Sequence, residues 1–147
     1  MKRVFVNERW CLGCHLCEYN CAFAASGEVD MAKALKGAAI HPRIRVEEDG
    51  KGVYFAVGCR HCKTPLCVKS CITGALTIKD GVITIDHDKC VGCYTCILAC
   101  PYGAVMPSEH GAVQKCELCT DNAKGSPACV AGCPNGAIVF EERGELA

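Results

Sequence analysis

Large side chains and long apolar runs are scarce in this sequence. Aromatic residues make up only 6% of the chain, and the 50% hydrophobic content counts the cysteines, so the conventional apolar core is thin. No stretch approaches the roughly 20 consecutive apolar residues of a membrane-spanning helix. The start, MKRVFVNERW, lacks the apolar run of a secretory signal. We therefore expect a cytoplasmic protein without direct membrane insertion.

The chain also lacks net charge and any block of like charges. Its 16 Lys and Arg balance its 16 Asp and Glu, so no basic stripe favours binding to nucleic acid. No glycine-rich loop follows a strand-like segment, and no nucleotide site is expected. No nucleophile or carboxylate pair stands in a recognisable catalytic frame. These absences favour a protein without substrate chemistry of its own.

Cysteine, in contrast, is abundant: the chain has 16 in 147 residues. A short chain with few large apolar residues needs cross-links or bound metal to hold its fold. Disulfides would require an oxidising compartment, which nothing in the sequence indicates. A metal protein is the simplest explanation.

The cysteines fall into four groups of four, and none is left over. Each group begins with C-x2-C and ends with C-x3-C, and only the gap between these pairs varies in length. Group I is Cys11, Cys14, Cys17 and Cys21; group II is Cys59, Cys62, Cys67 and Cys71; group III is Cys90, Cys93, Cys96 and Cys100; group IV is Cys116, Cys119, Cys129 and Cys133.

Group III is the most specific motif. From Cys90 to Pro101 the sequence reads CVGCYTCILACP, the C-x2-C-x2-C-x3-C-P run that binds cubane clusters in bacterial ferredoxins. The first three cysteines of such a run hold one cluster, and the fourth ligates the other cluster of a two-cluster module. Groups II and III have the layout of one module. Spacing therefore predicts one cluster at Cys59, Cys62, Cys67 and Cys100, and another at Cys90, Cys93, Cys96 and Cys71.

Strand-prone segments separate the cysteine groups. Residues 75–78 and 82–86 predict a hairpin after group II, and a second hairpin is expected around the turn at 49–52. Short helices should carry the C-x3-C ends, because positions i and i+4 share one helical face. A further helix is expected at 29–39. The strand-like pieces at 3–6 and 137–140 lie where an outer module would need paired edge strands.

These segments indicate one module inserted into another. The outer module is expected to comprise residues 1–57 and 108–147 with groups I and IV, and the inserted one residues 58–107 with groups II and III. The order of the four groups resembles the four-cluster iron–sulfur electron-transfer subunits of CO dehydrogenases, aldehyde oxidoreductases, formate dehydrogenases, hydrogenases and dimethyl-sulfoxide-reductase-type complexes. The stretches CRHCKTPLCVKSC, CVGCYTCILACPYGA and KCELC…CVAGCPNGAI carry the resemblance, which covers nearly the whole chain.

The resemblance implies an α+β fold of two ferredoxin-like 2[4Fe–4S] modules with pseudo-two-fold symmetry. It agrees with the nesting, and it implies four [4Fe–4S] clusters in all. The two outer clusters would be held by Cys11, Cys14, Cys17 and Cys133, and by Cys116, Cys119, Cys129 and Cys21.

Such a protein relays single electrons and turns over no substrate. Its expected partners are a catalytic oxidoreductase and a second redox protein, flavin- or nicotinamide-linked. The short chain is most similar to the small proteins that accompany CO dehydrogenase or tungsten aldehyde oxidoreductase, and a formate dehydrogenase or hydrogenase complex is the alternative. An anaerobic setting is expected because exposed clusters are sensitive to oxygen.

Structural zinc is the alternative of another class. Zinc sites pair two C-x2-C knuckles, and groups II and IV taken alone fit that pattern, whereas groups I and III are too compact. Among the neighbouring residues, we expect His61 to pack or form hydrogen bonds. Lys115 could raise the potential of a nearby cluster as a cation, and we expect it instead to be a solvated lysine. Trp10 either shields the first cluster or contacts a partner.

Overall fold

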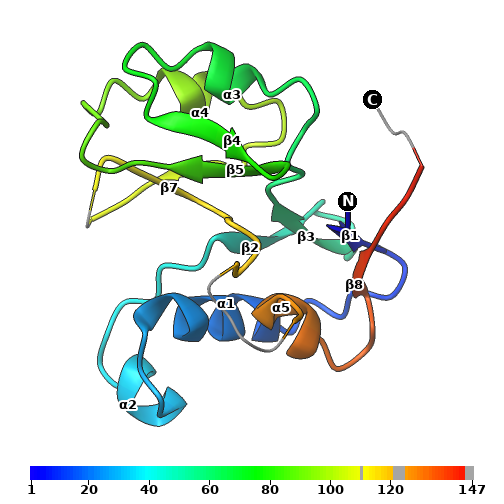
Figure 1. Cartoon of the computed structure of the whole chain (residues 1–147). Coiled ribbons are helices and arrows are strands. Elements are labelled where there is room, and N and C mark those ends of the chain that lie inside the picture. The colour runs from blue at the N-terminus through cyan, green and yellow to red at the C-terminus, as the bar shows by residue number, and fades with distance from the viewer. Residues whose placement is uncertain (110, 121–124, 145–147) are drawn as a thin grey trace.

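The computed structural model describes residues 1–109, 111–120 and 125–144. They form a small α+β fold in which short helices pack against two-stranded antiparallel sheets (Figure 1). The elements are β1 (Arg3–Val6), α1 (Leu16–Ser26), α2 (Met31–Leu35), β2 (Ile44–Glu48), β3 (Tyr54–Gly58), α3 (Leu66–Lys69), β4 (Leu76–Lys79), β5 (Val82–Ile85), α4 (Thr95–Ala99), β6 (Val105–Pro107), β7 (Val113–Lys115), α5 (Ala128–Ala131) and β8 (Ile138–Glu141).

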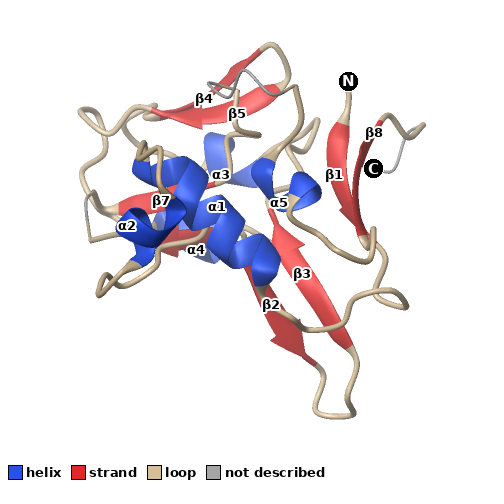
Figure 2. Ribbon diagram, turned by 90° about the horizontal axis from the view of Figure 1, so that it is seen from below, coloured by secondary structure: helices blue, strands red, loops and turns tan. Residues whose placement is uncertain are grey.

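Strands from the two ends of the sequence pair with each other. β1 lies antiparallel to β8, with Val4 opposite Phe140 (Figure 2). This is the pairing expected for the strand-like pieces at 3–6 and 137–140. The predicted hairpin around 49–52 is formed by β2 and β3, and the Asp49 carboxylate accepts hydrogen bonds from the backbone N–H groups of its turn. Together with α1 and α5 these sheets enclose one core, formed by Cys17, Cys21, Ile44, Ala56, Cys129 and Ile138.

The middle of the sequence forms a second core. β4 and β5 form the predicted hairpin, and Asp80 and Gly81 at its turn have φ of 49° and 81°, the left-handed values that two-residue hairpin turns require. β6 pairs with β7, a strand that the sequence did not predict and that lies beyond residue 107. This second core consists of Cys67, Leu76, Ile83, Cys96, Val105 and Val113.

The helices carry fewer of the C-x3-C ends than expected. Only α1 holds both cysteines of its pair, Cys17 and Cys21. α4 holds Cys96 but ends before Cys100, which has extended φ and ψ of −79° and 114°. Pro101 explains this ending, because proline disfavours helical backbone at the residue before it.

The helix expected at 29–39 is limited to α2. Asp30 caps its start by accepting hydrogen bonds from the backbone N–H groups of Ala32 and Lys33. Lys36 already has an extended ψ of 113°, and Gly37 follows with a positive φ of 68°. Within the described residues, no helix is long and apolar enough to cross a membrane.

Candidate iron–sulfur centres

The loops of groups I and III enter their helices with the same backbone conformation. Gly13 and His15 have φ of 65° and 61°, and the corresponding Gly92 and Tyr94 have 71° and 57°. His15 and Tyr94 are the N-caps of α1 and α4. Glycine adopts this left-handed conformation without steric cost, which allows the backbone to turn tightly between the cysteines.

One pocket gathers four cysteines from two groups. It is lined by Cys71 of group II together with Cys90, Cys93 and Cys96 of group III. Burial raises the pKa of Cys96, and the negative charges of Cys71 and Cys90 raise it further. Thr95 Oγ1 donates a hydrogen bond to Cys93 Sγ at 3.4 Å, which lowers the pKa of that thiol. The structure thus brings together the set that spacing assigns to one cluster.

The complementary set also converges. Burial raises the pKa of Cys67 to about 11, and the charges of Cys59 and Cys100 add to that effect. Burial is the main cause that raises the pKa of Cys59, and the negative charges of Cys100 and Cys62 raise it further. The backbone N–H of Ala104 donates to Cys100 Sγ at 3.4 Å. Cys100 therefore lies near the cysteines of group II, as the crossed assignment requires.

A third set lies at the end of the molecule that holds the termini. A pocket there is lined by Cys11, Cys14, Cys17 and Cys133 together with Trp10. Burial raises the pKa of Cys17 to about 12, and Glu18, Cys11 and Cys14 add negative charge. Trp10 lines this pocket while remaining 55% exposed, so its position fits both roles considered for it.

The fourth set joins group IV to Cys21. Burial raises the pKa of Cys129 above its ordinary range, and Cys116, Cys21 and Cys119 add to the shift. Backbone N–H groups donate to two of these sulfurs: Arg43 to Cys21 at 3.2 Å and Leu118 to Cys116 at 3.4 Å. This set and Cys59 of group II line the same pocket, so groups II and IV are adjacent there.

The chemistry of these residues fits iron–sulfur clusters. All sixteen cysteines are free, and thiolates are the ligands of [4Fe–4S] clusters. Backbone and hydroxyl donors to sulfur are the contacts that tune such clusters. Within the described residues, no three His, Cys, Asp or Glu side chains form a group that could hold a single metal ion.

His61 is an internal residue of the group II loop. It has φ of 45° and is fully buried, and its Nδ1 accepts a hydrogen bond from the backbone N–H of Ile83 at 3.0 Å. Burial and the positive charges of Lys115 and Arg3 lower its pKa to about 3, so the ring is neutral with its proton on Nε2. Among the described residues, His61 Nε2 and Arg3 Nε are buried nitrogens without a hydrogen-bond partner. The Nε2–H of His61 lies between Cys59 and Cys62 in sequence, and an unpaired donor there fits a site whose sulfur atoms accept hydrogen bonds.

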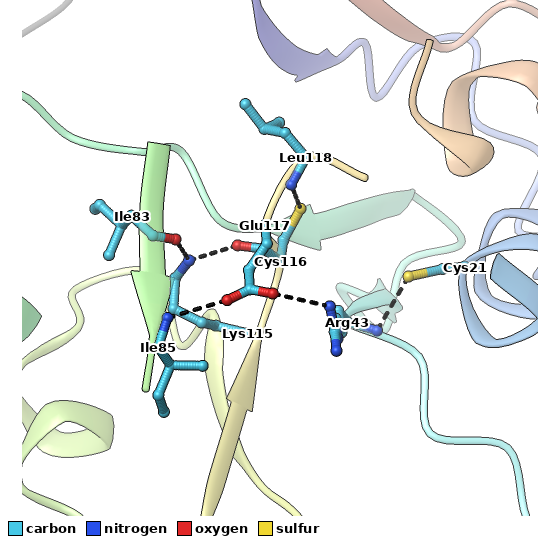
Figure 3. A network of polar contacts seen from close by, with 8 residues as sticks. All are labelled: Cys21, Arg43, Ile83, Ile85, Lys115, Cys116, Glu117 and Leu118. Carbon is cyan, nitrogen blue, oxygen red and sulfur yellow. Dashed lines mark hydrogen bonds and ion pairs between the residues drawn. The ribbon is translucent and has the colours of Figure 1, made fainter. Parts of the chain in front are cut away.

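Lys115 contradicts the expectation of a solvated lysine. It is 1% exposed, and its Nζ donates to the backbone carbonyls of Ile83 and Cys116 (Figure 3). The sequence could not show this, because it did not predict β7, the strand in which Lys115 is the last residue and from which its side chain reaches Ile83 of β5. The expectation that His61 would form hydrogen bonds is correct.

The contacts of the sulfur-bearing loops indicate an iron–sulfur protein, and comparison with known proteins agrees. Residues 51–143 match the 4Fe-4S dicluster domain family. The "Electron transport protein HydN" of Escherichia coli (strain K12) is 32% identical over 131 residues, which cover 78% of this chain and 74% of that protein. The chain therefore belongs to the 4Fe-4S dicluster family of iron–sulfur electron-transfer proteins.

This chain aligns with only part of several longer relatives. A subunit of the anaerobic dimethyl sulfoxide reductase of the same organism is 34% identical over 128 residues, which cover 80% of this chain and 60% of that subunit. The chain spans only 19% and 17% of two much longer Escherichia coli proteins, AegA and UacF. A solved structure, the active site complex BamBC of benzoyl coenzyme A reductase, aligns with 97% of this chain and 78% of its own at a TM-score of 0.51. At 22% identity that likeness supports the fold alone.

Proposed function

We propose that this chain is an electron-transfer subunit that holds four [4Fe–4S] clusters and relays single electrons between two redox partners. The pockets that gather cysteines from two different groups support the proposal. We assign the cysteines to four sets, each drawn from two groups. The sets are Cys59, Cys62, Cys67 and Cys100; Cys90, Cys93, Cys96 and Cys71; Cys11, Cys14, Cys17 and Cys133; and Cys116, Cys119, Cys129 and Cys21.

The clusters belong to two nested modules related by pseudo-two-fold symmetry. The outer module comprises residues 1–57 and 108–147 apart from the strand at 113–115. That strand pairs with β6 and joins the inserted module of residues 58–107. Two cores, each bounded by two-stranded sheets, support this division. The matching left-handed loops of groups I and III support the symmetry, as do Pro65 and Pro127, which occupy the N-cap positions of α3 and α5.

One partner is a catalytic oxidoreductase. The sequence favours CO dehydrogenase or tungsten aldehyde oxidoreductase, with a formate dehydrogenase or hydrogenase as the alternative. The relative named as part of an anaerobic dimethyl sulfoxide reductase adds that class of enzyme to the candidates. The second partner is a flavin- or nicotinamide-linked protein. The sixteen free thiols favour a reducing compartment, the cytoplasm.

Anaerobic purification and metal analysis test the proposal. Four cubane clusters require about sixteen iron and sixteen sulfide per chain, and their reduction should produce four one-electron signals. About four zinc per chain with no sulfide would instead support the structural alternative. Affinity capture under anaerobic conditions, followed by identification of the co-purified oxidoreductase, identifies the partner.

A further inference from the structure

Lys115 is a buried cation at the junction of two cysteine sets. Lysine is almost never fully buried unless an opposite charge lies nearby. The two described acceptors of its Nζ, the carbonyls of Ile83 and Cys116, solvate the ammonium group but carry no net charge. A buried ammonium group without a counter-charge is costly, so an anion is expected close by.

Cysteines of two sets flank this ammonium group and would supply that negative charge as cluster-bound thiolates. One acceptor of Lys115 Nζ is the carbonyl of Cys116, which belongs to the set with Cys21. The other is the carbonyl of Ile83, whose N–H donates to Nδ1 of His61, a residue between Cys59 and Cys62 of the other set. The pocket that Cys59 shares with Cys21, Cys116, Cys119 and Cys129 shows that the two sets are adjacent.

The neighbouring side chains His61 and Glu117 do not neutralise the positive charge of Lys115. His61 is fully buried and accepts a hydrogen bond on Nδ1, so its imidazole brings no negative charge to Lys115. Glu117 directs one oxygen to the backbone N–H of Ile85 and the other to Arg43 (Figure 3). The junction therefore has buried positive charge that the thiolate sets can balance.

We propose that Lys115 is an internal counter-cation shared by the cluster of Cys59, Cys62, Cys67 and Cys100 and the cluster of Cys116, Cys119, Cys129 and Cys21. This inference rests on the proposed function. Reduction adds one negative charge to a cluster, and the fixed ammonium group favours that state at both sites. When one electron passes between them, one cluster is oxidised as the other is reduced, no bond or proton changes place, and the charge beside Lys115 is conserved. Lys115 would thus raise the potentials of the two clusters between which an electron passes from one module to the other.

The test compares two lysines at the same place in the repeat. Lys115 precedes Cys116, and Lys89 precedes Cys90, but the Lys89 side chain is 62% exposed and pairs with Asp86. The full-length variants Lys115→Gln, Lys115→Met, Lys115→Arg and Lys89→Gln are purified anaerobically. Iron and sulfide contents are measured first, and the midpoint potentials of the clusters are then obtained by redox titration with paramagnetic resonance detection.

We expect Lys115→Gln and Lys115→Met to lower the potentials of two of the four clusters. The reduction equilibrium of each should fall at least tenfold, which corresponds to about 59 mV for one electron. Lys115→Arg should keep both potentials near those of the native protein, because it keeps the charge. Lys89→Gln should change none of them, because water already screens that exposed ammonium group.

Three results would overturn the inference while leaving the proposed function intact. The first is a native iron content with potentials that move no more in Lys115→Gln than in Lys89→Gln. The second is loss of iron from both Lys115→Gln and Lys115→Met while Lys115→Arg assembles normally, which would assign Lys115 to assembly alone. The third is a shift confined to one cluster, which would exclude a shared cation. Failure of the native protein to bind iron and sulfide would instead overturn the proposed function.

Discussion

Glu117 accepts a hydrogen bond on Oε1 from the backbone N–H of Ile85 at 3.0 Å. Its other oxygen, Oε2, lies 3.5 Å from Nη1 of Arg43, whose backbone N–H in turn donates to Cys21 Sγ (Figure 3). Ile85 packs against the core of the inserted segment, and Cys21 belongs to the core near the termini. A single carboxylate therefore connects the two cores of the protein.

Replacing this carboxylate should loosen that connection. Glu117→Ala leaves the N–H of Ile85 and the guanidinium of Arg43 without their acceptor, and an unsatisfied, partly buried donor costs about 1–3 kcal/mol. Glu117→Gln should cost less, since its amide oxygen can still accept from Ile85. The free energy of unfolding, followed by circular dichroism in denaturant, measures both, with Glu48→Ala at an exposed position as the control. Equal values for Glu117→Ala and Glu48→Ala would contradict the structural role.

Two apolar residues on β4 differ in burial and should contribute differently to the free energy of unfolding. Leu76 is 2% exposed and belongs to the second core, whereas Ile78 on the same strand is 48% exposed. Leu76→Ala should lower the free energy of unfolding by about 2–5 kcal/mol through lost burial and the remaining cavity. Ile78→Ala, as a surface change, should stay within about 0.5 kcal/mol of the native protein. Leu76 and Ile78 lie on the same face of the strand, so similar losses for both variants would mean that this face is buried along its whole length.

Gly13 combines a left-handed backbone with close contact to an aromatic ring. A Cβ at this position would lie 2.6 Å from Cδ1 of Tyr54. Gly27 has a similar φ of 71° but nothing within 4 Å of its Cβ position, so Gly27→Ala isolates the conformational cost, about 1–2 kcal/mol. Gly13→Ala should cost more and should release iron from the cluster of group I.

A double variant separates the two causes of that effect. Tyr54→Ala removes the ring, so Gly13→Ala combined with Tyr54→Ala should destabilise the fold by less than the sum of the single changes. Iron content and the free energy of unfolding provide the readouts. Strict additivity would show that the ring does not limit this position.

The cysteine spacing and the turn chemistry made much of this fold predictable. Two-residue turns such as Asp80-Gly81 select their hairpins locally, and the crossed positions of Cys71 and Cys100 follow from the ferredoxin run. β7 could not be predicted, since its three residues gain their strand conformation only by pairing with β6. Burial of Lys115 depends on that pairing and was missed for the same reason.

Removal of iron should unfold the protein. Each core includes cysteine side chains, and the remaining apolar residues are few for a protein of 147 residues. Metal binding contributes folding free energy in such small domains. Oxidative removal of iron in the presence of a chelator should therefore eliminate most ordered secondary structure by circular dichroism. Anaerobic reconstitution with iron and sulfide should restore it, and an ordered apoprotein would contradict this dependence.

The crossed arrangement of the cysteines makes a sharper prediction. Cys100→Ser should damage the cluster of Cys59, Cys62 and Cys67, which precede it in sequence, and leave the cluster of its own run intact. Cys71→Ser is the matched variant and should have the reciprocal effect, because Cys71 lines the pocket of Cys90, Cys93 and Cys96.

Each of these two variants should lose up to about four of its sixteen iron atoms, and the two should lack different paramagnetic signals. Serine keeps the size of the side chain while removing the thiolate, so packing changes little. If Cys100→Ser and Cys71→Ser each removed the signal of the cluster held by their own run, groups II and III would each be self-contained. The two halves of the inserted segment would then have no shared clusters to join them, and a relay would need contacts other than these ligands.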